Sequence, residues 1–135
     1  MFGTNKLIKI LKHPWTISWV LISLGITVRL VQYLSNRPLW IDEAMLTQNI
    51  LTRSFRGLFT PLEYEQQAPM GFLLIEKLLV TLFGNAEVVL RAFPFVASVA
   101  SLVAMATIAL DVLPLPFAYI AQLLFVLSVP LIVYA

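Results

Sequence analysis

The sequence predicts an all-α, polytopic membrane protein with about three transmembrane helices and two juxtamembrane helices in the first external loop. Apolar residues make up 60% of the chain and charged residues only 12%, whereas about 25% of the residues in a soluble domain are charged. Three apolar runs approach the length of about 20 residues that a helix needs to cross a bilayer. This composition excludes a water-soluble globular domain, a disordered tail and a nucleic-acid-binding protein as function classes.

The residue types also limit the chemistry. The chain contains no cysteine and one histidine. These counts exclude a disulfide framework, a thiolate metal site, a cysteine nucleophile and a metal site built from several histidines. The pI of 9.2 comes from a small excess of basic residues and does not indicate a nucleic-acid partner.

The N-terminal segment, residues 1–14, is basic, and residues 15–34 form the first predicted span. Its positive charge places the N-terminus in the cytoplasm, because cytoplasmic flanks of spans carry an excess of lysine and arginine. Arg29 lies near the outer end of this span, where we expect its long side chain to reach the lipid head groups. A cleaved signal peptide is the alternative, but the apolar run is long and no small-residue cleavage site follows it.

The external loop, residues 35–87, begins with a predicted helix over residues 42–53. Asp42 is the expected N-cap, and Gly57 and Pro61 follow the end of the helix. Apolar residues do not gather on one side of this helix, so we expect it to pack among protein surfaces rather than on lipid.

A second helix is predicted over residues 70–84. It is strongly apolar, but Glu76 and Lys77 occupy its centre. Two adjacent charges at the bilayer centre would be costly, so the favoured interpretation is a helix lying on the outer membrane face. The alternative is a short true span, which would invert the orientation of every later segment.

The remaining chain is predicted to hold a span at residues 88–110, a cytoplasmic turn at 111–115 and a third span at 116–135. The second span is rich in alanine and serine, which allows close approach of neighbouring helices in lipid. Pro130 is a candidate kink in the third span. Because this run has no polar anchor after it, we expect the chain to be the N-terminal part of a longer protein.

The residues Trp40, Asp42 and Glu43 form the centre of the candidate site. Two adjacent carboxylates at a membrane surface are suited to a general base or, at Asp42, to binding a divalent cation. A purely structural interpretation stays open: Asp42 caps a helix, Glu43 favours its positive end and Trp40 anchors the chain at the interface.

Two further polar residues are candidate substrate-binding groups. Arg53 could bind a lipid phosphate through bidentate contacts, although a solvated helix end is the favoured interpretation. Gln67 lies in a polar loop segment that could simply be surface.

The order of these motifs resembles a known family. The sequence PLWIDEA follows the first span, and QQAPMGFLLIEKLLVTLFGNAEVVLRAFPF leads into the second, where Leu90, Arg91 and Pro94 form an LR-x-x-P pattern. This ordered set resembles the start of the GT-C membrane glycosyltransferases, in the branch similar to the family 39 protein mannosyltransferases and the lipid A aminoarabinose transferases. The resemblance extends over nearly the whole chain, but Pro69 stands alone where many relatives have two prolines.

The resemblance implies a GT-C N-terminal module that transfers a sugar from a polyprenyl-phosphate donor on the periplasmic or external side, with inversion. It places the family's acidic loop residue at Asp42, and Glu43 is its companion. Asp42 would act as the catalytic base or as a ligand for Mg²⁺ or Mn²⁺. It implies as partners the bilayer, the lipid-linked donor and further helices of a longer protein or subunit. The expected location is the plasma (inner) membrane, and the 135 residues alone are expected to be inactive.

Two other functions remain as alternatives. A small non-enzymatic membrane scaffold or subunit would use the helix rich in small residues to join partner helices. Half of a transporter is less favoured, because the predicted spans carry only Arg29 and Arg91, both near span ends.

Overall fold

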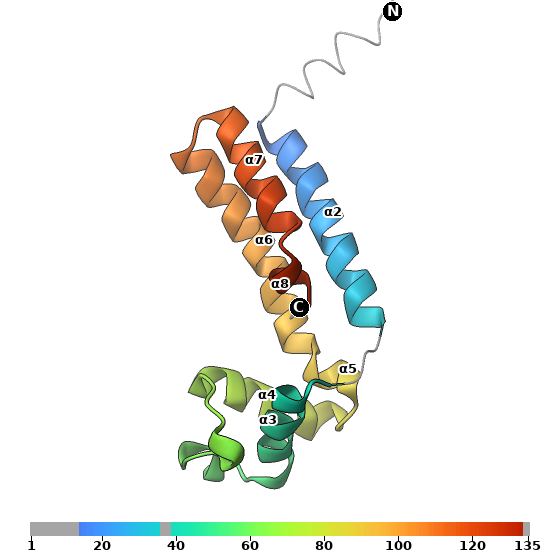
Figure 1. Cartoon of the computed structure of the whole chain (residues 1–135), viewed down its shortest axis with the longest axis vertical. Helices are drawn as coiled ribbons and strands as arrows, with labels where there is room; N and C mark the ends of the chain where they lie inside the picture. Colours follow the sequence, from blue (N-terminus) through green and yellow to red (C-terminus); the bar gives the residue numbers. More distant parts are fainter. Residues whose placement is uncertain (1–13, 36–38, 134–135) are drawn as a thin grey trace, which may run out of the picture. The chain divides into compact units, whose positions relative to one another are not determined.

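The computed structural model describes residues 14–35 and 39–133, and it is helical with no strand in these ranges (Figure 1). Predictions that concern the basic N-terminus or the last two residues of the third span lie outside this part of the chain. The described residues divide into two compact units: unit 1 comprises the chain up to Tyr33 and from Pro94 onward, and unit 2 comprises Leu34–Phe93. The helices, in chain order, are α2 (Pro14–Leu34), α3 (Ile41–Thr52), η1 (Gly57–Phe59), η2 (Glu63–Glu65), α4 (Met70–Phe83), α5 (Glu87–Leu90), α6 (Ala92–Val112), α7 (Leu115–Val126) and α8 (Val129–Val133).

Unit 1 is built from α2, most of α6, α7 and α8. Its core consists of Ile22 from α2, Leu102 and Ala106 from α6, and Val126 from α7. Gly25 allows close packing there, since a Cβ atom at this position would lie 2.9 Å from both terminal methyl carbons of Leu102. Small residues therefore do bring helices together in this unit, as expected for packing in lipid.

Large apolar side chains cover the outside of unit 1. Two helical stretches, Pro14–Leu34 and Glu87–Val112, are long and apolar enough to cross a membrane. Val20 on α2, Ile108 on α6 and Leu124 on α7 are examples. Each of these residues is 60 to 67% exposed. An apolar exterior of this kind suits a lipid environment.

The third predicted span is not one continuous helix. α7 has 12 residues and ends at Val126, and α8 begins at Val129. The break falls just before Pro130, whose ring prevents the backbone hydrogen bond that a continuous helix would need. The span at residues 116–135 stays a prediction.

Arg29 differs from its prediction. Its side chain is fully buried in unit 1 instead of reaching toward head groups. Nε donates a hydrogen bond of 2.6 Å to Ser98 Oγ, and Nη1 donates one of 3.3 Å to the Gly25 carbonyl. The hydroxyl of α6 supplies a partner that the sequence of α2 alone does not reveal.

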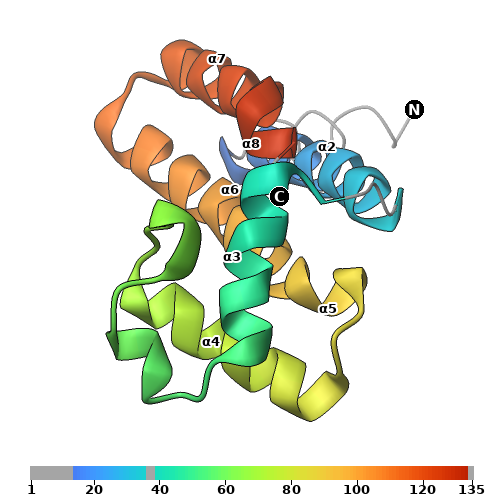
Figure 2. The same cartoon turned by 60° about the horizontal axis from the view of Figure 1, so that its bottom comes forward.

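Unit 2 contains α3, η1, η2, α4 and α5, and Figure 2 shows α3 beside α4. Its core is Ile50 from α3, Leu58 from η1 and Leu73 from α4. Phe72 of α4 also packs against Phe93, with ring centroids 5.9 Å apart. α4 has 14 residues, fewer than a span requires, and it ends where Gly84 adopts a φ of 90° that favours glycine.

The entry to the second span is interrupted. The predicted span at residues 88–110 corresponds to α5 and α6, which are separated at Arg91. Pro94 has no N–H to donate to the carbonyl of Leu90, and this missing bond accounts for the separation.

Candidate functional site

The first turn of α3 carries the acidic pair of the candidate site. The helix begins at Ile41, and Trp40 is its N-cap residue, with extended backbone. The prediction of Asp42 as the N-cap is therefore wrong. The Glu43 carboxylate instead accepts a hydrogen bond of 3.0 Å from the Trp40 N–H, which is one half of a capping box.

Asp42 and Glu43 have different surroundings. Glu43 Oε2 lies 3.7 Å from Arg91 Nη2, so this carboxylate links α3 to the end of α5. Asp42 is exposed and makes no hydrogen bond or ion pair within the described part of the chain. Asp42 is thus the free carboxylate of the pair, and Glu43 is engaged in holding the helix.

An open groove of about 340 Å³ lies along α3. Three of its lining residues, Ile41, Met45 and Gln48, recur at helical spacing and so share one face of α3. Ala44 and Tyr64 complete the lining. Asp42 precedes Met45 by three residues, which places it at the border of this face. The groove therefore offers an apolar wall with one carboxylate at its edge.

Tyr64 lines the groove from an unusual loop. Tyr64 and Glu65 both have positive φ angles, of 60° and 55°. Each such residue costs about 1 to 3 kcal/mol and persists only where surrounding contacts enforce it. The side chain of Gln66 is also close, with Nε2 3.9 Å from Met45 Sδ. The sequence reasoning missed Tyr64 and Gln66, because only the folded loop brings them to α3, and it missed Met45 of α3 because its neighbours come from that loop.

The buried side chain of Asn49 enforces this loop. Its Nδ2 donates to the Met45 carbonyl at 3.0 Å and to the Glu63 carbonyl at 3.3 Å. Its Oδ1 accepts a hydrogen bond of 2.9 Å from the Glu63 N–H. A single amide thus fixes the start of the Tyr64 loop against α3.

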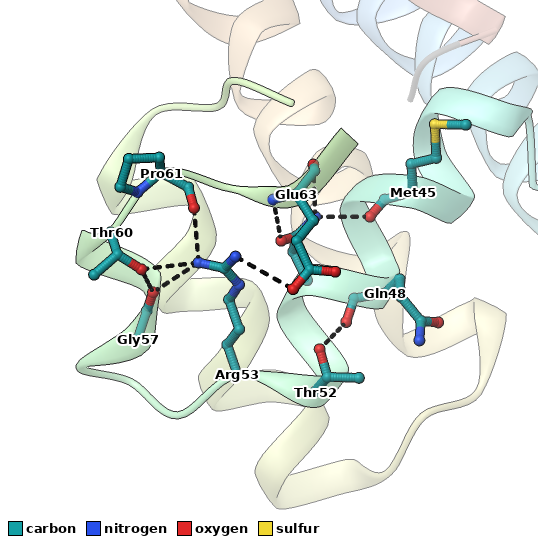
Figure 3. A network of polar contacts seen from close by, with 9 residues as sticks. Met45, Gln48, Thr52, Arg53, Gly57, Thr60, Pro61 and Glu63 are labelled. Atoms are coloured by element: carbon teal, nitrogen blue, oxygen red, sulfur yellow. Dashed lines mark hydrogen bonds and ion pairs between the residues drawn. The ribbon is translucent and has the colours of Figure 1, made fainter. Parts of the chain in front are cut away.

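The Arg53 side chain forms hydrogen bonds and an ion pair with residues of the same loop (Figure 3). Its Nη1 donates to Thr60 Oγ1 and to the Pro61 carbonyl, both at 2.9 Å, and to the Gly57 carbonyl at 3.2 Å. Its Nη2 lies 3.5 Å from Glu63 Oε1. A phosphate would have to compete with all these contacts, so the geometry favours a structural role for this guanidinium.

The other predicted binding residues lie at the surface. Trp40 is 59% exposed, next to Ile41 of the groove. Gln67 is exposed but does not line the groove. The structure thus brings Asp42 and Trp40 to one end of α3 and leaves Gln67 apart from the groove lining.

The described residues include no group of three or more histidine, aspartate or glutamate side chains that could hold a metal ion. Mg²⁺ and Mn²⁺ are usually held by several oxygen ligands. Asp42 would be a single ligand, because Glu43 pairs with Arg91. The site as described does not fit a resident metal.

Comparisons with protein-family models, with curated protein sequences and with solved structures gave no match for this chain.

Proposed function

We propose that these 135 residues form the N-terminal part of a membrane glycosyltransferase that uses a sugar linked to a polyprenyl phosphate. The motif order from PLWIDEA to the LR-x-x-P pattern supports this proposal through its resemblance to the GT-C enzymes. In the proposed arrangement the N-terminus is cytoplasmic and unit 2 lies at the external face of the plasma membrane. α7 and α8 together supply the third span, and α3 and α4 are the juxtamembrane helices.

The observation that carries the proposal is the free carboxylate of Asp42. A general base must be able to approach the proton it removes, and it must not be consumed by an internal ion pair. Asp42 is exposed at the edge of the α3 groove and is unpaired within the described residues, whereas its neighbour Glu43 is paired with Arg91. The apolar lining of the groove suits a lipid-linked or amphipathic substrate.

The proposed reaction is a single displacement at the anomeric carbon of the sugar. An acceptor hydroxyl oxygen forms the new bond to this carbon, and the bond between the carbon and the phosphate oxygen breaks. The polyprenyl phosphate leaves with the electron pair, and Asp42 takes the hydroxyl proton. Attack from the face opposite the leaving group inverts the anomeric configuration.

The test is a transfer assay in membranes of cells that express the protein from its native gene, with a radiolabelled polyprenyl-phosphate sugar. Asp42→Asn should lower the transfer rate by at least about a hundredfold, because it removes the base. Asp111→Asn, a change at another exposed carboxylate, should leave it unchanged. The purified 135-residue chain should give no transfer by itself.

Normal transfer by the Asp42→Asn protein would remove Asp42 from the reaction. Absence of transfer in membranes that contain the wild-type protein, with every tested polyprenyl-phosphate sugar, would favour the scaffold alternative. Ala97, Ala100 and Ala104 are exposed on α6 at helical spacing, and such small residues permit close contact with a partner helix.

A further inference from the structure

Glu76 is a buried carboxylate that the proposed reaction does not use. It lies in the middle of α4 and is only 1% exposed. Neither Oε1 nor Oε2 has a hydrogen-bond partner. At helical spacing it shares a face of α4 with Leu73 and Val80, and both of these pack in the core of unit 2. An acidic side chain thus occupies a helix position where the pattern of buried residues predicts an apolar side chain.

α3, α5 and η1 pack closely on α4, and Phe93 at the start of α6 also contacts it through Phe72. Several of their charged groups already have partners: Glu43 pairs with Arg91, and Arg53 pairs with Glu63. On α4 itself, the neighbouring ammonium of Lys77 donates hydrogen bonds to the carbonyls of Ile50 and Leu51. The charged residues on or capping α3, α5 and η1 are Asp42, Glu43, Arg53, Arg56, Glu87 and Arg91, and the first two turns of α6 carry none.

Ionisation of Glu76 would leave a charge with no partner inside this core. Removing an unpaired charge from water is costly, and the group responds by holding its proton. Burial accordingly raises the pKa of Glu76 from its ordinary value of 4.5 to about 7. The folded unit therefore binds this proton more tightly than the unfolded chain does.

The direction of the pH effect follows from this difference. Below pH 4.5 the carboxyl is protonated in both states, and the packing of unit 2 has its full stability. As the pH rises from 4.5 to about 7, the unfolded chain loses the proton first, so the stability of the packed state falls. Above this range the destabilisation is complete and does not grow further.

We propose that Glu76 is a proton-operated switch, which keeps α4 packed on α3 when it is protonated and loosens this contact when it ionises. Lys77 extends the effect to α3, because its ammonium binds the last carbonyls of that helix and moves with α4. The switch acts on the helix that carries Asp42 at its other end. It does not depend on the proposed sugar transfer.

Hydrogen exchange of the full chain in lipid nanodiscs tests the switch. Protection of the α4 amides is measured at pH 5 and pH 8 and corrected for the intrinsic exchange rate. Protection in the wild-type protein should fall at pH 8 by at least about tenfold, which corresponds to one pKa unit. Glu76→Gln should abolish this fall, and Glu65→Gln, at an exposed carboxylate, should retain it.

Two results would overturn the proposal: equal α4 protection in the wild-type protein at both pH values, or an unchanged pH response in Glu76→Gln. If Glu76→Gln does not fold, infrared titration of the wild-type protein can test the switch instead. A protonated carboxyl band that disappears near neutral pH supports the switch. Loss of all carboxyl bands by pH 5 contradicts it.

Discussion

Asn49 holds the loop that forms one wall of the groove, and its three hydrogen bonds can be tested directly. Asn49→Ala should lower the free energy of unfolding of unit 2 by about 1 to 3 kcal/mol, because it leaves the Glu63 N–H without its partner. Thermal unfolding measured by circular dichroism, together with hydrogen exchange of residues 57–66, would record the change.

Thr52→Ala is the matched control for this prediction. The Thr52 hydroxyl donates only to the Gln48 carbonyl within α3, and the residue is exposed. This variant should retain the wild-type exchange rates in the loop. Equal exchange of the loop in Asn49→Ala and wild-type protein would show that Asn49 does not fix it.

Individual residues show where sequence reasoning succeeds and where it ends. The motif around Asp42 could be located from the sequence because it depends only on neighbouring positions. The burial of Arg29 could not be predicted in this way, because its partner Ser98 lies on another helix. The roles of Arg53 and Glu43 were also hidden, since their contacts form only when the loop and α5 have folded.

At the scale of helices, Gly25 lets α2 lie close to Leu102 of α6 and Val126 of α7. Gly25→Ala should lower the stability of this unit by about 1 to 3 kcal/mol, because the new methyl group would overlap Leu102 and crowd Val126. Some of this cost is relieved if the Leu102 side chain shifts. Thermal unfolding in detergent micelles would measure the difference from the wild-type protein.

Gly71→Ala provides the matched control, because a Cβ atom there would meet nothing within 4 Å. It replaces glycine in the first turn of α4, where alanine favours the helix. We expect unchanged or slightly raised stability. A larger loss from Gly71→Ala than from Gly25→Ala would contradict the packing described for unit 1.

Helix positions were easier to predict than helix ends. The apolar runs and proline positions located the long helices, because burial in lipid or protein requires long apolar segments. The short helices η1 and η2 depend on contacts of Arg53 and Asn49 with the loop and so could not be predicted. The α5–α6 break adjoins Pro94, a signal that was present in the sequence but was interpreted only as part of a motif.

For the whole molecule, the contrast between apolar and polar segments anticipated the division into two units. The apolar helices α2, α6 and α7 form unit 1, and the polar segment with its short helices forms unit 2. Composition can separate these regions because each must satisfy a different solvent. The orientation across the membrane is predicted separately, from the basic N-terminus.

In the proposed arrangement Asp42 faces the outside of the cell, and labelling of single cysteines can show whether it does. The chain has no cysteine, so Gln48→Cys on the exposed side of α3 and Asp111→Cys at the end of α6 can each be the only thiol. In intact cells, a membrane-impermeant maleimide should label the Gln48→Cys protein and should label the Asp111→Cys protein only after the membrane is opened. Labelling with the reverse pattern would contradict sugar transfer at the external face.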